Sequence, residues 1–387
     1  MEPRPIRPVP GSSLDPGDVI GRDDTILSAV GQMRNGSSLL LSDPRRMGKT
    51  ALLDRLCNHP GVGLTAVKID YEGVHSQEEF FRRTVSGLRA HQRIRERVEQ
   101  AVGPYVEFEG KLGPVKIKAA FAAKPANALL VDVIGSVDAR IDAGELVVIA
   151  MDEVPLAVGG IVDAEGPAAA RQLLEALRQL RRKNPSSIRW IVTGSIGFHH
   201  VLRRCGSTEG VINDLVNLPL GPLTDQAARD LAACLLLGIG QDATNEAVLD
   251  AMVERSGGIP YLIHALAHQL STNPTAITVA DVADAFDAYA EDRDQSRAVT
   301  HFLTRLDANY GDLSALAYRV LDALATAEPL SSAELRTIDP RLEDRDVFLR
   351  LVDDLVDDHY LTRTARAWRW RYPVLRRIWQ HRRDIDQ

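Results

Sequence analysis

Two short segments of the chain carry residue types that suit phosphate chemistry. The first ends in Gly48, Lys49 and Thr50 and follows the apolar run 38–41, which is expected to be a buried strand. Backbone N–H groups, a helix N-terminus, a lysine and a hydroxyl together match a triphosphate and its Mg²⁺ ion, so we predict binding of ATP with Mg²⁺. In this pattern Lys49 reaches the β- and γ-phosphates and Thr50 ligates the metal. The neighbouring residues expected to line the same site are Arg46, Met47 and Ala51.

Asp43 is a departure from the usual phosphate loop, G-x-x-x-x-G-K-[ST], which begins with glycine. A carboxylate roughly 6 Å from a phosphate would cost about 2–3 kcal/mol at an effective dielectric constant of about 20. In one interpretation Arg45 and Arg46 offset this repulsion, and in another the Asp43 side chain points outward from the end of the strand. We expect nucleotide binding to be weaker or more regulated, but not absent.

The second segment is a buried strand over 145–151 that ends in Asp152 and Glu153. This is the Walker B pattern, in which Asp152 holds Mg²⁺ through its water shell and Glu153 orients or deprotonates the attacking water. The alternative is a strand followed by a solvated acidic turn. The resulting candidates for catalysis, with Ser195 discussed below, are Lys49, Asp152, Glu153 and Ser195.

A further strand is expected over 189–193 and is followed by small residues, of which Thr193 and Ser195 carry hydroxyl groups. The carboxyl end of such a strand faces the ligand crevice of a doubly wound sheet, so either hydroxyl is a candidate sensor of the γ-phosphate. Serine also ends strands for reasons of turn geometry alone. Four arginines near this edge are candidates for an arginine finger in a neighbouring subunit, although most such residues are only solvated helix faces: Arg181, Arg182, Arg203 and Arg204.

Strands that alternate with helices position these residues and predict a parallel, doubly wound α/β sheet. The expected strands are 38–41, 64–70, 145–151 and 189–193, and the expected helices are about 26–33, the segment from the phosphate loop through Leu56, about 76–101 and about 166–183. Alternating apolar and polar residues over 104–121 indicate an inserted β-hairpin, either an exposed edge for self-association or a plain solvated hairpin. After about residue 221 the pattern is helical.

Bulk composition excludes several classes of protein. The 387 residues carry a net charge of −7, which gives no global attraction to nucleic acid or to anionic membranes. The three cysteines lie far apart in the sequence, so we expect reduced thiols instead of disulfides or a zinc site. No apolar run approaches the roughly 20 residues that span a bilayer, and the first residues contain no apolar signal core. We expect a soluble, cytoplasmic protein without membrane contact.

Taken together, these motifs resemble the archaeal-type ATPase family of the STAND branch of P-loop NTPases, which are relatives of AAA+ ATPases. The matching segments are 19–23, 43–50, 151–153, 193–195 and 258–260. The resemblance implies that Gly21 and Arg22 line the adenine pocket, and that Pro260 caps the base with Tyr261 beside it. The chain departs from the family at Asp43 and also at Thr25, where the family usually has an acidic residue.

The resemblance also implies a domain plan: a P-loop NTPase core, a helical lid and a C-terminal winged helix. The expected boundaries are a Pro-rich, extended leader over 1–18, the core over 19–221 with its hairpin at about 104–121, the lid over 222–305 and the winged helix over 313–387. Within the winged helix we expect a capped helix from Ser331, a recognition helix over 346–361 and a wing over 361–372.

The charges of the winged helix leave its partner open. The expected recognition helix is acidic and would be repelled by phosphates, whereas the wing and tail interleave arginines with Trp368, Trp370 and Trp379. The basic tail could contact a nucleic-acid backbone. In the alternative, helix and tail pair with each other, the tryptophans form a core, and the domain faces a protein or inhibits the ATPase.

We expect an ATP-driven conformational switch that hydrolyses ATP slowly, passes through ATP and ADP states, and assembles with itself or with a partner protein. One alternative is a DNA-associated ATPase that acts through the winged-helix tail. Another is a scaffold that binds ATP with little hydrolysis in a signalling or defence module.

Overall fold

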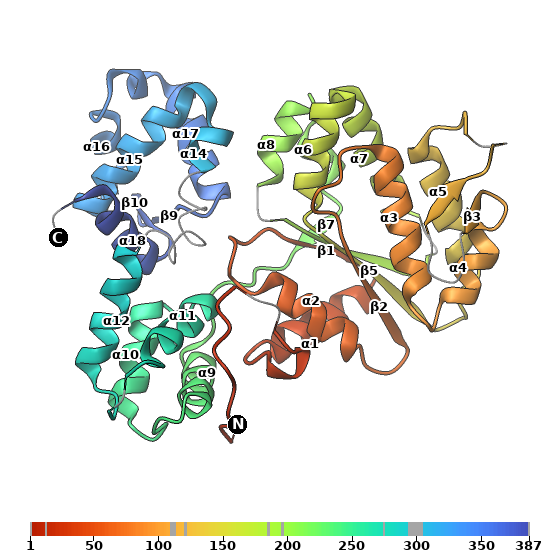
Figure 1. Cartoon of the computed structure of the whole chain (residues 1–387). Helices are drawn as coiled ribbons and strands as arrows, with labels where there is room; N and C mark the ends of the chain where they lie inside the picture. Colours follow the sequence, from red (N-terminus) through yellow and green to blue (C-terminus); the bar gives the residue numbers. More distant parts are fainter. Residues whose placement is uncertain are drawn as a thin grey trace. The chain divides into compact units, whose positions relative to one another are not determined.

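The computed structural model describes residues 2–11, 14–108, 114–119, 122–183, 186–194, 197–273, 275–292 and 305–385. The chain forms two compact units (Figure 1). The sheet unit comprises Asp24–Ser42 and Lys49–Pro219, and the helical unit comprises Met1–Asp23, Asp43–Gly48 and Leu220–Gln387. Among the described residues, no helix combines the length and the apolar character needed to cross a bilayer.

A five-stranded parallel sheet forms the centre of the sheet unit, in the order β2-β5-β6-β1-β7. Its strands are β1 (Ser38–Leu41), β2 (Leu64–Asp70), β5 (Leu146–Asp152), β6 (Ile188–Thr193) and β7 (Leu215–Asn217). The first four confirm the predicted strands, whose apolar runs are typical of strands covered on both faces. The short edge strand β7 was not predicted, because two of its three residues are exposed and give no apolar run.

Helices cover both faces of this sheet (Figure 1). On one face lie α1 (Asp23–Arg34) and α2 (Lys49–Asn58). On the other lie α3 (Gln77–Ala90), α4 (Arg95–Val102), α5 (Ala126–Asp138), α6 (Val154–Glu165), α7 (Pro167–Arg181) and α8 (Phe198–Arg204). Because both faces are covered, Val147 through Asp152 are all buried in β5.

One helix prediction was wrong in part, and the helices α5, α6 and α8 were not predicted. The single helix expected over about 76–101 is two helices, α3 and α4, joined by a turn in which Ile94 is buried and its N–H donates to the His91 carbonyl. No Gly or Pro occurs between residues 91 and 94, so tertiary packing and not a local breaker decides this turn. Helix α6 was missed altogether, although Gly166-Pro167 marks its boundary with α7.

The predicted hairpin is confirmed as an antiparallel pair of short strands, β3 (Val106–Phe108) and β4 (Val115–Ile117). Val106 and Val115 enter the core of the sheet unit, and the Arg89 guanidinium lies 3.9 Å from the centre of the Phe108 ring. Residues 109–113 lie outside the described residues. Self-association through this hairpin stays a prediction.

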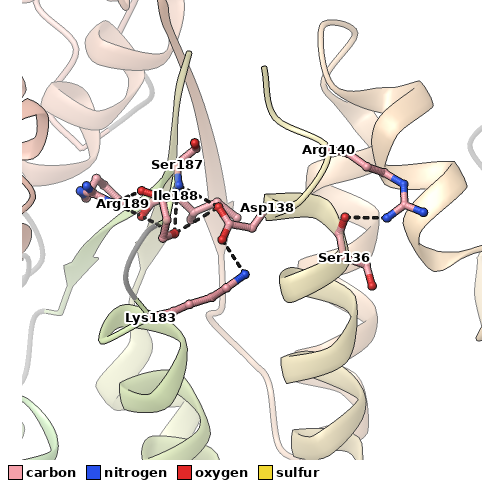
Figure 2. A network of polar contacts seen from close by, with 8 residues as sticks. Ser136, Asp138, Arg140, Lys183, Ser187, Ile188 and Arg189 are labelled. Carbon is pink, nitrogen blue, oxygen red and sulfur yellow. Dashed lines mark hydrogen bonds and ion pairs between the residues drawn. The ribbon is translucent and has the colours of Figure 1, made fainter. Parts of the chain in front are cut away.

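A buried carboxylate fixes the start of β6 (Figure 2). Asp138, the last residue of α5, accepts from the Lys183 ammonium at 2.8 Å and from the Ser187 backbone N–H at 2.8 Å. The Arg189 side chain donates to the Ile188 carbonyl in the same network. The network lies at the amino end of β6, and its role is therefore to hold the α7–β6 connection.

In the first part of the helical unit, the described residues form four helices and an extended leader. The helices are α9 (Asp225–Gly238), α10 (Glu246–Ser256), α11 (Pro260–Leu270) and α12 (Val279–Glu291). The 3₁₀ turns of the helical unit are Pro16–Asp18, Gly311–Leu313 and Pro340–Glu343. A further 3₁₀ turn, Glu209–Val211, belongs to the sheet unit. The predicted leader is extended but packed: Ile6 is buried, its N–H donates to the Cys234 carbonyl at 2.9 Å, and the Val9 N–H donates to His264 Nδ1 at 3.3 Å.

The C-terminal part of this unit contains the elements of a winged helix. The helices are α14 (Arg305–Asn309), α15 (Ser314–Thr326), α16 (Ser332–Arg336), α17 (Arg345–Asp357) and α18 (Pro373–Arg383), and β8 (Leu330–Ser331), β9 (Leu361–Thr364) and β10 (Ala367–Trp370) form an antiparallel sheet in the order β8-β10-β9. Ser331 and Glu334 form the expected capping box at α16. Trp368, Trp370 and Trp379 are buried, which favours the interpretation that they form a core.

Candidate nucleotide-binding site

The carboxyl ends of neighbouring parallel strands bring Asp152, the predicted Walker B aspartate, beside two hydroxyl groups. Strand β6 lies between β5 and β1, and Leu41 is paired with Thr193 at its end. The Thr193 hydroxyl donates to Asp152 Oδ1, and the Thr50 hydroxyl donates to Asp152 Oδ2 at 3.0 Å. Asp152 and Thr193 are buried, whereas Thr50 is exposed. The arrangement orients both carboxylate oxygens of Asp152.

This set of oxygen atoms fits the metal that the phosphate loop implies. Mg²⁺ prefers hard oxygen ligands and keeps several of its own waters. The Thr50 hydroxyl and the Asp152 carboxylate lie 3.0 Å apart at the carboxyl ends of the strands. Both groups can therefore ligate the same small cation. These two residues would hold Mg²⁺, directly or through its water shell.

The loop before α2 contains a glycine in a left-handed conformation next to the first residue of the helix. Gly48 has a φ of +91°, a conformation that other L-residues rarely adopt, and a side chain added there would meet no atom within 4 Å. Lys49 is the first residue of α2 and is buried, so its charge lies at the positive end of the helix dipole. Bringing a cation to a helix N-terminus is unfavourable for stability, and an anion bound there would compensate it. Ala51, in the same first turn, is half-buried.

Glu153 has a strained backbone at the point where the general base is expected. Its φ of 57° and ψ of 37° are left-handed, and it caps α6 without a side-chain cap bond. For a residue other than glycine this conformation costs on the order of 1–3 kcal/mol, and such outliers cluster at functional sites. The strain turns the chain sharply after Asp152 and leaves the Glu153 side chain half-buried at the sheet edge.

Asp43 is buried and makes backbone hydrogen bonds that the sequence did not predict. Only 2% of its surface is exposed, and within the helical unit its carboxylate accepts two backbone N–H groups: Leu220 at 2.8 Å and Gly221 at 3.1 Å. Two amide donors help to compensate the burial of a carboxylate. The substitution of the first loop glycine therefore creates an anchor between residue 43 and the segment 220–221.

Arg22 completes the same anchor from the other side. Its guanidinium donates to the carbonyls of Leu220 at 2.8 Å, Gly221 at 2.8 Å and Met47 at 2.9 Å, and only 5% of the residue is exposed. Burial lowers the pKa of Arg22 to about 10, and the charge of Asp43 opposes this shift. The arginine expected in the adenine pocket thus holds three backbone carbonyls, one of which belongs to the phosphate loop.

The other residues expected to contact the base also lie in the helical unit. A side-chain carbon on Gly21 would come within 2.4 Å of the Ala227 Cβ atom, so glycine permits the close approach of this segment to α9. Pro260 is the first residue of α11 and is half-buried. Tyr261 lies next to it, and the Arg46 guanidinium is 4.7 Å from the centre of the Tyr261 ring. The Met47 side chain is buried.

The remaining sequence candidates have mixed outcomes. Ser195 lies outside the described residues. Arg181 is buried against Asp214, with Nε 2.7 Å from its carboxylate, so this arginine is a structural residue and not an available finger. Arg204 pairs with Asp163, and Arg203 approaches His200 Nδ1 at 3.2 Å. Arg182 is exposed.

Comparison with solved structures shows the fold. The chain matches a Walker-type ATPase of Pyrococcus abyssi with a TM-score of 0.64 at 14% sequence identity, over 98% of each chain. The chain has a P-loop, AAA+-like ATPase fold. Weaker likenesses are to the ORC2 protein of Aeropyrum pernix (TM-score 0.48, 13% identity, 94% of this chain and 93% of that chain) and to the Holliday junction branch migration motor RuvB of Thermotoga maritima (0.40, 13%, 91% and 92%). No protein-family model and no curated protein matches this chain.

Sequence reasoning missed two residues that organise this AAA+-like fold, Leu220 and Gly221. They follow β7, and they act through their backbone N–H and carbonyl groups, so no side-chain motif marks them. The dipeptide Gly221-Pro222 was the available signal, because it predicts a turn at a fixed point in the chain.

Proposed function

We propose that this protein binds ATP with Mg²⁺ and hydrolyses it slowly, as a conformational switch that acts on itself or on a partner protein. One observation carries the proposal: Asp152 accepts from Thr50 and from Thr193 at the strand ends, next to the start of α2 where Lys49 is buried. Parallel α/β sheets bind ligands at this edge, and the donor set suits a metal-bound triphosphate.

Each residue has a distinct role in the proposed reaction. Lys49 and the backbone N–H groups at the start of α2 neutralise the phosphate oxygens. Thr50 and Asp152 hold Mg²⁺, which supplies charge stabilisation at the β- and γ-phosphates when it is bound. Glu153 orients the attacking water and accepts its proton. Gly21, Arg22 and Pro260, with Tyr261 beside it, are proposed to form the base-binding region, in which Arg22 acts through the carbonyls that it holds.

The decisive experiment measures ATP binding by calorimetry and phosphate release by steady-state kinetics. Lys49→Ala should lose most of the ATP affinity, because it removes the cation at the helix N-terminus. Glu153→Gln should bind ATP about as tightly as the wild type but release phosphate about 10²- to 10⁴-fold more slowly, since it lacks the base. Lys68→Ala is a matched control, because Lys68 lies in β2 and pairs with Asp54 instead of serving the site.

Two results separate the possible functions, and a third identifies a loss of folding. If wild type, Lys49→Ala and Glu153→Gln release phosphate at equal rates, the chain is not the ATPase proposed here. Tight ATP binding by the wild type without phosphate release would instead support the nucleotide-dependent scaffold. A loss of binding in Lys68→Ala equal to that in Lys49→Ala would point to a general loss of folding.

A specific observation favours a second candidate, contact with a nucleic-acid backbone through the wing. Three wing arginines are exposed and have no acidic partner within the described residues: Arg363, Arg366 and Arg369. By contrast, the tail arginines Arg376 and Arg383 pair with Glu328 and Asp322, not with the acidic helix α17. Arg366 lies at the hairpin tip with a φ of 72°, after Ala365 with a φ of 49°. Two left-handed residues suit a two-residue turn between β9 and β10, and this turn presents the Arg366 side chain at the surface.

A further inference from the structure

Two side chains of opposite charge bind the backbone of the same two residues, Leu220 and Gly221, in the helical unit. The carboxylate of Asp43 accepts the N–H groups of Leu220 and Gly221, and the guanidinium of Arg22 donates to their carbonyls. Both side chains are almost completely buried, so these charge-assisted bonds are shielded from solvent competition. The segment 220–221 is therefore held at four backbone atoms by two residues far away in the sequence.

The same two side chains also hold the phosphate loop. Asp43 is the residue that replaces the first loop glycine, and Arg22 donates to the carbonyl of Met47, which directly precedes Gly48. Both ends of the segment 43–47 are thus held by hydrogen bonds. At one end the Asp43 side chain bonds the backbone of Leu220 and Gly221, and at the other the Met47 carbonyl accepts from Arg22. A loop tied at both ends keeps its N–H groups oriented for an anion at less entropic cost than a free loop does.

We propose that Asp43 is a positioning residue of the phosphate loop, which it holds in its triphosphate-binding shape by accepting the backbone N–H groups of Leu220 and Gly221. This inference rests on the proposed ATP binding at Lys49 and Thr50. Asp43 acts through the backbone and touches no reacting atom. Its carboxylate therefore favours nucleotide binding, contrary to the repulsion expected from its sequence position.

A reciprocal effect follows from the same contacts. If the anchor stabilises the loop that binds ATP, then ATP bound to the loop stabilises the anchor by the same free energy. The segment 220–221 opens the long helical part of the chain that ends with α18. Binding of nucleotide is therefore coupled to the segment that follows Gly221. The coupling acts through the two hydrogen bonds that the Asp43 carboxylate accepts.

The test compares wild type, Asp43→Asn and Asp43→Gly. Asparagine keeps the shape but turns an N–H₂ group toward one of the two amide donors, and glycine restores the usual phosphate-loop residue. We expect both variants to raise the Kd and the KM for ATP about tenfold, the effect of one charged hydrogen bond. The kcat should stay within about twofold, because uniform binding affects KM and not the chemical step.

Amide hydrogen exchange supplies a readout independent of turnover. Between residues 220 and 224 only Leu220, Gly221, Leu223 and Thr224 carry a backbone N–H, since residue 222 is proline. The Leu223 N–H donates to the Gly258 carbonyl at 2.8 Å and serves as an internal reference. ATP with Mg²⁺ should slow exchange at Leu220 and Gly221 in the wild type, and this slowing should disappear in Asp43→Asn.

Asp339→Asn is the matched control, because Asp339 is a buried carboxylate of the same unit that bonds Arg319 and Arg341. It should lower stability without changing the Kd for ATP. If Asp43→Asn fails to fold, Arg22→Lys tests the other half of the anchor, since lysine keeps the charge but loses the forked donors. Tighter or equal ATP binding by Asp43→Gly, or unchanged exchange at Leu220 and Gly221, overturns this inference alone. Absence of ATP binding by the wild type overturns the proposed function and this inference with it.

Discussion

The hydroxyl of Thr193 donates a hydrogen bond to the carboxylate of Asp152, and both side chains are buried. Thr193→Val keeps the shape of the side chain but removes the donor, which leaves one carboxylate oxygen unpaired at a cost of about 1–3 kcal/mol. We expect this variant to require more Mg²⁺ for half-maximal phosphate release and to turn over ATP about tenfold more slowly. Steady-state kinetics across a Mg²⁺ titration measures both effects.

Thr193→Ser is the control for this prediction, since serine keeps the hydroxyl and loses only a methyl group. It should retain most of the activity and the wild-type Mg²⁺ dependence. Equal kinetics in Thr193→Val and Thr193→Ser would show that the hydrogen bond to Asp152 has no part in the reaction.

Glu153 should combine a gain in stability with a loss of function when it is replaced by glycine. Its φ of 57° is a conformation that glycine adopts without strain. We expect Glu153→Gly to raise the free energy of unfolding by about 1 kcal/mol, the balance between relieved strain and the greater flexibility of the unfolded chain, while phosphate release is abolished. Urea denaturation of Glu153→Gly beside Glu153→Gln, which keeps the strained backbone, isolates the conformational part. A less stable Glu153→Gly would contradict the assignment of strain.

His264 should make the docking of the leader depend on pH. Its Nδ1 accepts the Val9 N–H, and burial lowers the pKa of His264 to about 4, with the charge of Asp18 opposing this shift. Because the folded pKa lies below the ordinary value of 6.5, the neutral form is favoured in the fold. Its stabilisation is complete above about pH 6.5 and is lost as the pH falls toward 4, by up to about 1.4 kcal/mol for each pH unit.

The measurement is chemical denaturation of wild type and His264→Asn at pH 7.5 and 5.5. Asparagine offers an acceptor oxygen near the position of Nδ1 and does not titrate. The wild type should lose more stability than His264→Asn between these two pH values, and its leader should become more sensitive to proteolysis. The same loss in both proteins would show that another group controls the acid response.

The wing should determine any binding of nucleic acid. Replacing Arg363, Arg366 and Arg369 with glutamine should weaken binding to duplex DNA of mixed sequence and reduce the slope of log K against log salt by about 2–3, since each phosphate contact contributes about 0.9. Deletion of residues 361–387 is an unsuitable test, because it removes buried Trp368, Trp370 and Trp379. Fluorescence anisotropy across a salt series measures the slope.

The matched control for the wing removes three exposed arginines of the sheet unit, Arg34, Arg93 and Arg140. It changes the net charge equally but should leave the salt slope unchanged. Equal losses in the two triple variants would indicate a general charge effect, and no binding by the wild type at low salt would remove the nucleic-acid candidate.

Sequence reasoning worked best where a residue pattern has one physical meaning. The apolar runs at 38–41, 64–70 and 145–151 are strands because a parallel sheet that is covered on both faces buries most of their positions. It failed where packing overrides local preference, as at the turn between α3 and α4, which has no Gly or Pro to mark it. The three-residue edge strand β7 was not found because two of its residues are exposed and give no apolar run.

The sequence by itself determined the phosphate-binding pattern: Gly48, Lys49 and Thr50 after a strand, and Asp152 with Glu153 after another. Local spacing suffices there, because the residues act next to elements that their own neighbours form. Only the tertiary structure decided the meaning of Asp43 and Arg22. Their partners include backbone atoms of Leu220 and Gly221, almost two hundred residues away. Because nearly every residue type carries a backbone N–H and a carbonyl, the sequence cannot mark these partners. The structure shows a buried carboxylate with two amide donors, where the sequence alone showed only an acidic residue in the phosphate loop.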